Sequence, residues 1–373
     1  MMHARKRFLL LLGALAIAAP AATEFPYHHT SAGRFANPHV VPSEPGGILR
    51  FIRWRIFSKD KWATYDAQRD GAVPAATPQL VPIGERSENA RVTWVGQSTV
   101  LIQHNGVNIL TDPIFSDRAS PLAFAGPARK SAPGLSLDAL PPIDVVVISH
   151  DHYDHLDEPS IRRLGNAPAY FVPLGLKAWM VNAGIDKTRV FEMDWWDSQK
   201  LAVKGAEVSI TATPSQHVSG RTLTDRNRSL WAAWAIAWDD FSVWFGGDTG
   251  YNDVQFKAIG ARFGGFDLGI IPIGGYGPRD YMRAFHVDPA QAVQIHQDIG
   301  ARRSMAVHWG TFHLTAEPLL EPPQALRAAT QTAGLAPDAV TAFAVGESRS
   351  YLPNAQVSRR TSALSKPSAN PRG

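Results

Sequence analysis

Short apolar runs typical of buried strands recur along the chain from residue 91 onward. The first three occupy residues 92–95, 98–102 and 107–111, and Asn105-Gly106 between the last two is a dipeptide typical of tight hairpin turns. These runs therefore predict an antiparallel meander. Further strands are predicted at residues 143–148, 169–172, 208–212, 231–238, 241–245, 268–273, 305–307 and 340–345.

Helical segments interleave with the later strands. Asp157 is placed to cap a helix that has Pro159 in its first turn and Gly165 at its end. Further helices are predicted at residues 176–183, 289–299 and 323–333. Because strands and helices interleave without a visible internal repeat, residues 91–352 are predicted to form one α/β unit, made of two sheets with helices outside.

The first residues differ in composition from the rest. Arg5, Lys6 and Arg7 precede an apolar run over residues 8–19, and small residues follow. That order predicts a secretory signal peptide over residues 1–22. The protein is then expected to be exported, to the periplasm or cell envelope, at the periphery of a membrane. An uncleaved membrane anchor is the alternative, which the short apolar run disfavours.

Residues 23–90 form a lead with one amphipathic segment. On a helix over residues 48–57 the isoleucines share one face while Arg50 and Arg53 point elsewhere, as in a helix that lies on a membrane surface. A helix packed on the body of the protein, with solvated arginines, is the open alternative. At the other end, residues 353–373 are rich in Ser, Pro and Ala, a composition that predicts a disordered tail.

Charge and cysteine content exclude several classes of protein. The formal net charge is +4, and Arg5, Lys6 and Arg7 of the predicted signal supply most of that excess. The remaining chain therefore gives no indication of a nucleic acid partner. The chain has no cysteine, which excludes disulfides and thiolate metal ligands. Histidine and carboxylate side chains remain as potential metal ligands.

The densest chemical motif is His150-Asp151-His152-Tyr153-Asp154-His155, which follows the predicted strand at residues 143–148. Burying so many unpaired imidazoles and carboxylates at this density would be costly. The motif also lies in a strand-to-helix loop, where a rigid scaffold holds side chains in place. It therefore predicts a metal site.

Three later strands lead to further residues of metal-binding type. These residues are His217, Asp248 and His308. With four residues of the motif they make seven candidate ligands, whereas a single zinc ion needs only three or four. The sequence therefore predicts two metal ions. The predicted ligands are His150, His152 and His217 for the first ion and Asp154, His155 and His308 for the second, with Asp248 shared.

The motif and its distant partners resemble the metallo-β-lactamase fold superfamily, whose members are αββα sandwiches with a metal site at one edge of the paired sheets. Longer strings, spread over residues 94–349, resemble one branch of it, the N-acyl-phosphatidylethanolamine-hydrolysing phospholipase D family. They are TDPIFSDRASP from residue 111, PPIDVVVISHDHYDHLD from 141, GGDTGY from 246, HVDPAQAV from 286 and SMAVHWGTF from 304. The resemblance implies an αββα sandwich of two mixed sheets, with two zinc ions, or iron or manganese, at the seven ligands.

The resemblance also implies roles for residues outside the ligand set. Tyr153 and His286 match family positions near the substrate headgroup, and Asp112 matches a position needed for activity, where it would orient a metal ligand. The alternatives are packing for Tyr153, a helix start for His286 and a turn for Asp112. Two strings depart from the family: residues 308–313 read HWGTFH instead of HWGTFA, and residues 276–282 read YGPRDYM instead of YEPRWFM. The acyl and headgroup preference is therefore left open.

Two metal ions acidify a shared water and hold phosphoryl oxygens. By the resemblance to the phospholipase D branch, the predicted activity is phosphodiester hydrolysis by metal-bound hydroxide, with Asp154 and Asp248 as catalytic residues that orient the water and His286 on the phosphate. N-acyl-phosphatidylethanolamine would give phosphatidic acid and an N-acylethanolamine. The expected partners are a phospholipid substrate and a membrane surface, and a homodimer is left open. The alternatives are a hydrolase of the same fold that acts on a lactone, a β-lactam or another phosphodiester, and a non-catalytic envelope binding protein.

Overall fold

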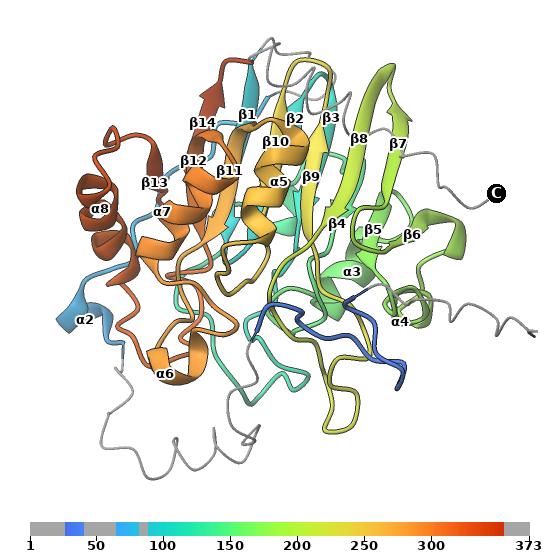
Figure 1. Ribbon diagram of the computed structural model, residues 1–373, viewed down its shortest axis with the longest axis horizontal. Coiled ribbons are helices and arrows are strands. Elements are labelled where there is room, and N and C mark those ends of the chain that lie inside the picture. The colour runs from blue at the N-terminus through green and yellow to red at the C-terminus, as the bar shows by residue number, and fades with distance from the viewer. Residues whose placement is uncertain (1–26, 41–64, 82–88, 354–373) are drawn as a thin grey trace, which may run out of the picture.

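A computed structural model describes residues 27–40, 65–81 and 89–353. Two seven-stranded sheets face each other, and helices cover their outer faces (Figure 1). This αββα sandwich of two mixed sheets confirms the predicted fold class. The predicted signal peptide, the amphipathic segment at residues 48–57 and the tail from residue 354 lie outside the described residues, so these remain predictions.

The first sheet has the strand order β14-β1-β2-β3-β4-β5-β6. Neighbours are antiparallel from β14 to β3 and parallel from β3 to β6. The predicted meander is confirmed, and Asn105 and Gly106 both have positive φ in its hairpin turn, as a two-residue turn requires. The strands are β1 (Ala90–Gly96), β2 (Thr99–His104), β3 (Val107–Thr111), β4 (Val145–Val147), β5 (Ala169–Pro173), β6 (Val190–Met193) and β14 (Ser348–Tyr351).

The second sheet repeats this plan with the order β13-β12-β11-β10-β9-β8-β7. Neighbours are antiparallel from β7 to β10 and parallel from β10 to β13. The strands are β7 (Ser198–Val203), β8 (Ala206–Thr213), β9 (Ala233–Ala237), β10 (Ser242–Phe245), β11 (Phe266–Pro272), β12 (Ala301–Val307) and β13 (Val340–Ala342).

The helices follow the predicted positions, with several additions. They are α2 (Ala67–Asp70), α3 (Glu158–Leu164), α4 (Lys177–Asn182), α5 (Gln255–Phe263), α6 (Arg279–Met282), α7 (Pro289–Asp298) and α8 (Pro322–Thr332), with 3-10 turns η1 (Leu137–Ala139) and η2 (Lys187–Arg189). Asp157 precedes α3 as predicted, but its side chain does not cap the helix backbone. Its carboxylate instead accepts hydrogen bonds from the hydroxyls of Ser116 and Ser160. None of the described helices combines the length and apolar composition needed to cross a membrane.

Buried tryptophans connect the core to the loops at one edge of the sandwich. Trp94, Trp231 and Trp234 are almost completely buried. Their indole N–H groups donate to backbone carbonyls of Gln97, Ser215 and Ile148 respectively, at 3.0, 3.0 and 2.9 Å. A buried indole provides a large apolar surface and one directed hydrogen bond. The packed core therefore fixes the backbone of three loops at this edge.

Candidate metal centre

The seven predicted ligands lie together just beyond the carboxyl ends of strands from both sheets. In the second sheet β8, β10 and β12 run in the same direction, because β8 and β10 are both antiparallel to β9 and the pairs from β10 to β12 are parallel. Their carboxyl ends therefore reach one edge, where His217, Asp248 and His308 follow them. The motif that begins at His150 follows β4 of the first sheet.

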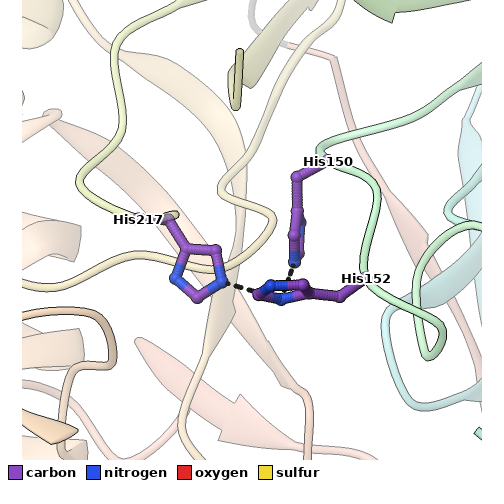
Figure 2. Close-up of side chains that lie close together, drawn as sticks. All are labelled: His150, His152 and His217. Carbon is purple, nitrogen blue, oxygen red and sulfur yellow. Dashed lines mark hydrogen bonds between the residues drawn. The ribbon is translucent and has the colours of Figure 1, made fainter. Parts of the chain in front are cut away.

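His150, His152 and His217 form the first group (Figure 2). Nδ1 of His152 lies 2.9 Å from Nε2 of His150 and 3.2 Å from Nε2 of His217. The neutral ring nitrogen of an imidazole offers one donor or one acceptor site, so contact with two partners fits three ligands around a cation better than a hydrogen-bonded trio. Burial lowers the pKa of all three imidazoles, which keeps their lone pairs available to a metal.

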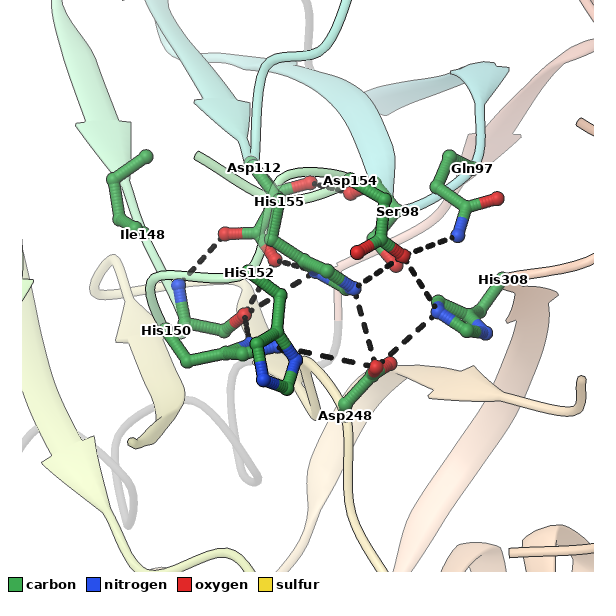
Figure 3. Close-up of polar contacts among 12 residues, drawn as sticks. Gln97, Ser98, Asp112, Ile148, His150, His152, Asp154, His155, Asp248 and His308 are labelled. Carbon is green, nitrogen blue, oxygen red and sulfur yellow. Dashed lines mark hydrogen bonds and ion pairs between the residues drawn. The ribbon is translucent and has the colours of Figure 1, made fainter. Parts of the chain in front are cut away.

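Asp154, His155, Asp248 and His308 form the second group, and all four are buried (Figure 3). Oδ2 of Asp154 and Oδ2 of Asp248 each lie 3.2 Å from Nε2 of both His155 and His308. Burial alone would raise the pKa of each carboxyl, but the facing imidazoles outweigh it and hold both pKa values well below the usual range. Both carboxylates are therefore charged, the state in which they bind a metal ion.

Asp248 lies between the two groups. Besides its contacts in the second group, its Oδ2 lies 3.8 Å from Nε2 of His217 and 4.0 Å from Nε2 of His150. Gly247 allows this approach, because it has φ +56° and a Cβ there would lie 2.3 Å from Cβ of Ser149. The loop that carries Asp248 can therefore pack directly on the loop that carries His150, which places one carboxylate against both sets of imidazoles.

The spacing and the unpaired atoms of the cluster fit divalent metal ions. Zinc bound tetrahedrally by nitrogen places its ligand atoms about 3.3 Å apart, close to the 2.9 and 3.2 Å found within the two groups. Nε2 of His155 and Oδ1 of Asp248 are buried and have no hydrogen-bond partner within the described part of the chain. Imidazole and carboxylate ligands suit zinc, iron or manganese. The number and identity of the ions remain predictions.

Asp112 lies behind His155, outside the cluster, and is completely buried. Its Oδ2 accepts from Nδ1 of His155 at 2.7 Å, while the backbone N–H of Ser149 donates to Oδ1, also at 2.7 Å. The hydroxyl of Ser149 donates to Oδ2 at 2.5 Å. A carboxylate on Nδ1 keeps that proton in place and leaves Nε2 of the ligand free to face a metal. The position is the one expected for a residue that orients a ligand.

The two predicted substrate contacts lie in different surroundings. His286 is half-buried beside the cluster, and its Nδ1 lies 3.8 Å from Oδ2 of Asp248. Tyr153 lines a separate cavity, next to residues 115–123. Its ring lies under the guanidinium of Arg221, 4.0 Å from the ring centroid, and its hydroxyl donates to the carbonyl of Arg221. Contact with substrate remains a prediction for both residues, and the structure also gives Tyr153 the packing role named as its alternative.

Five residues of the cluster form the floor of a cavity of about 290 Å³, namely His152, Asp154, His217, Asp248 and His308. The apolar residues on its walls are Val218, Met282, Phe285 and Leu314, and Tyr281 also lines it. Tyr281 and Met282 belong to the segment at residues 276–282 that departs from the family string. His313, the other departure, lines an adjoining recess beside Gln97 and His308. Both departing strings therefore contribute residues beside the cluster.

Three contacts that support the ligands had no clear signal in the sequence. Nε2 of Gln97 donates to Oδ2 of Asp154 at 2.9 Å. The carbonyl of Phe285 lies 2.9 Å from Nδ1 of His217. Asn37, in the amino-terminal segment, donates from Nδ2 to the carbonyl of His217 at 2.7 Å. That segment is attached to the domain through His28 and His29, whose Nε2 atoms lie 2.6 and 2.9 Å from the carboxylate of Asp194.

Comparison with known proteins agrees with this fold and site. Residues 107–309, more than half of the chain, match the family described as the beta-lactamase superfamily domain. The chain is 44% identical over 242 residues to the N-acyl-phosphatidylethanolamine-hydrolyzing phospholipase D 1 of Caenorhabditis elegans, covering 63% of this chain and 68% of that protein. It is 37% identical over 246 residues to the mitochondrial N-acyl-phosphatidylethanolamine-hydrolyzing phospholipase D of Saccharomyces cerevisiae, covering 65% and 52%.

A solved structure shares the fold. The isothiocyanate hydrolase from Delia radicum gut bacteria superposes with a TM-score of 0.54 at 18% identity, covering 69% of this chain and 98% of that one. Family match, sequence identity and fold thus agree with the histidine and aspartate cluster at the sandwich edge. The chain therefore belongs to the metallo-β-lactamase superfamily, in the branch that contains these phospholipases D, and is a metal-dependent hydrolase.

Proposed function

We propose that the protein is a di-zinc phosphodiesterase of phospholipase D type that hydrolyses N-acyl-phosphatidylethanolamine or a related phospholipid. The observation that carries the proposal is the position of Asp248, whose Oδ2 lies within 4.0 Å of imidazole nitrogens from both ligand groups. A carboxylate shared in this way fits two adjacent ions. The similarity to two N-acyl-phosphatidylethanolamine-hydrolyzing phospholipases D supports the substrate class.

The residues present would hold the ions in two sets. His150, His152 and His217 would bind one ion, and Asp154, His155 and His308 the other, with Asp248 between them. Bound there, such ions would supply an acidified water and would neutralise phosphoryl oxygens. Asp154 and Asp248 would orient the attacking water towards phosphorus, because their charged oxygens can accept its hydrogen bonds. His286, at the side of the cavity, contacts a phosphoryl oxygen.

The proposed reaction adds one water across one phosphorus–oxygen bond. The water oxygen attacks phosphorus, and the bond from phosphorus to the oxygen of the N-acylethanolamine breaks. One of the water's protons ends on the leaving oxygen and the other stays on the phosphate or is released to solvent, so the products are phosphatidic acid and an N-acylethanolamine. The apolar walls at Val218, Phe285 and Leu314 fit the acyl chain of the leaving group.

The lipid substrate leads to a proposed location. We propose that the chain is exported and works at a membrane surface in the cell envelope. The basic, apolar and small-residue order of residues 1–22 supports export, and the amphipathic residues 48–57 support attachment to a lipid surface.

A four-substrate screen tests the proposed activity. Purified protein loaded with zinc is assayed against N-acyl-phosphatidylethanolamine in mixed micelles, bis(p-nitrophenyl) phosphate, a lactone and a β-lactam. We expect hydrolysis of the first two and loss of both activities after chelation, with recovery when zinc is restored. Efficient hydrolysis of the lactone or the β-lactam without turnover of either phosphodiester would reject the proposed reaction.

A further inference from the structure

An unpaired arginine lies at the cavity above the cluster. Arg226 is the one lysine or arginine among the residues that line this cavity. It is exposed, and its guanidinium has no hydrogen-bond or ion-pair partner within the described part of the chain. By contrast, the two carboxylates on the cavity floor, Asp154 and Asp248, face imidazoles at 3.2 Å. The cationic side chain is therefore available to a ligand in the cavity.

The backbone that carries Arg226 is held from the amino-terminal segment. The guanidinium of Arg34 donates to the carbonyls of Arg226 and Thr224. The next residue, Asn227, exchanges hydrogen bonds with Phe35: the N–H of Phe35 donates to its carbonyl at 2.9 Å, and its Nδ2 donates to the carbonyl of Phe35 at 3.1 Å. These hydrogen bonds fix the position of the Arg226 Cα against the segment that also contains Asn37.

The same loop is tied to the metal-ligand loop. Asn227 has a positive φ of 57°, and its N–H donates to the carbonyl of Ser219 at 3.0 Å. Ser219 is two residues after His217, whose carbonyl accepts from Asn37 at 2.7 Å. The carboxylate of Asp225 accepts hydrogen bonds from the backbone N–H groups of Arg221 and Thr222. The arginine is therefore presented from a fixed loop at a fixed place relative to His217.

The chemistry of the cavity identifies the ligand. A guanidinium forms two parallel hydrogen bonds with a phosphate more readily than with a neutral carbonyl. The other residues that line the cavity include no lysine and no second arginine, so Arg226 is the one guanidinium that an anionic group would meet there, besides His286 and the ions of the proposed function. We propose that Arg226 binds a phosphoryl oxygen of the substrate and selects anionic phosphodiesters over neutral esters and lactones. The phosphodiester part of this inference rests on the proposed function, whereas the binding of a phosphate anion does not.

The test uses Arg226→Gln and Arg228→Gln in the full-length, zinc-loaded protein. Arg228 is a matched control, because it is exposed on the same loop and does not line the cavity. For Arg226→Gln we expect kcat/KM on bis(p-nitrophenyl) phosphate to fall about tenfold, the lower end for a lost hydrogen bond to a charged group. Arg226→Lys keeps the charge without the paired donors, so it should recover part of that loss. Arg228→Gln should stay within about twofold of the wild type, and zinc content should be unchanged in all variants.

A second readout separates this inference from the proposed function. Calorimetric titration of the zinc-loaded proteins with inorganic phosphate should show about tenfold weaker binding for Arg226→Gln than for Arg228→Gln. If the wild type hydrolyses no phosphodiester but the two variants differ in phosphate binding as expected, the proposed function is wrong and the role of Arg226 in binding a phosphate is supported. If Arg226→Gln matches Arg228→Gln in both measurements, the inference is wrong, whatever the activity.

Discussion

Replacing Asp112 by Asn tests how the outer residues of the centre support the metal ligands. The carboxylate accepts three hydrogen bonds, two from Ser149 and one from Nδ1 of His155. An amide has a single oxygen, so its NH2 group must face donors at one of the two oxygen positions. Asn also tolerates the positive φ of 32° at this position, so the substitution changes charge and hydrogen bonding while leaving the backbone unstrained.

The expected magnitude follows from the hydrogen bonds that the carboxylate makes and the amide cannot. One hydrogen bond to a charged group contributes about 1.5–3 kcal/mol, which corresponds to roughly 10- to 150-fold in an equilibrium constant. If the amide nitrogen faces His155, that imidazole must carry its proton on Nε2, the atom that lies 3.2 Å from Asp248. That nitrogen would then have no lone pair to bind a metal ion, so the second ligand group would lose one ligand. We therefore expect one of the two metal equivalents to bind about 10- to 100-fold more weakly, as is typical when a partner of a metal ligand is removed.

The assay is competition with a chromogenic chelator, combined with elemental analysis after dialysis against buffered zinc. Asp117→Asn is the matched control, because Asp117 is exposed and lies outside the cluster. Tryptophan fluorescence should show that both variants are folded. Zinc affinity of Asp112→Asn within about twofold of the control would refute the role assigned to this carboxylate.

Three further predictions use other parts of the molecule. Asp248→Asn should abolish hydrolysis and reduce the metal content, and a fully active variant would exclude a shared ligand. Burial first, and then nearby Arg303, lower the pKa of His296 to about 4, below its ordinary value of 6.5, so its stabilising contribution is complete above pH 6.5 and is lost as the pH falls towards 4. Relative to His296→Gln, the free energy of unfolding of the wild type, measured by urea denaturation, should therefore fall by roughly 2 kcal/mol over that pH interval. The same pH dependence of the free energy of unfolding in both proteins would contradict this. Deleting residues 48–57 should slow hydrolysis of lipid in vesicles but leave hydrolysis of bis(p-nitrophenyl) phosphate unchanged. Equal loss of both activities would mean that the segment has a structural role.

The strands that carry ligands could be predicted because they are buried on both faces and therefore read as apolar runs. β7 was missed, since it is an edge strand whose sequence SQKLAV is largely exposed or half-buried. β14 was missed for a similar reason, as it pairs only with β1 and has no apolar pattern. α5 was also missed, although the sequence contains a signal for it. Phe256, Ile259 and Phe263 recur at helical spacing, and all three are buried in the structure.

The clustering of the seven candidate ligands could be predicted because residue type and position at strand ends are both visible in the sequence, whereas metal binding by them stays a prediction. The contacts that hold these side chains in place could not be predicted, because they depend on which distant residues the fold brings together. Asn37 lies 180 residues from His217, the carbonyl of which it contacts. Gln97 looks like an ordinary polar residue after a strand, yet it contacts Asp154, and its backbone carbonyl accepts from the N–H of His308. Nothing in the sequence marks Arg226 as different from Arg228.

The proposed reaction can be tested directly by following the oxygen atom of water. Zinc-loaded protein is incubated with N-acyl-phosphatidylethanolamine in water enriched in oxygen-18, and both products are analysed by mass spectrometry. Attack at phosphorus predicts one labelled oxygen in the phosphate of phosphatidic acid and none in the hydroxyl of the N-acylethanolamine. Release of free fatty acid, label in the ethanolamine hydroxyl, or no turnover by protein carrying two zinc ions would contradict the account.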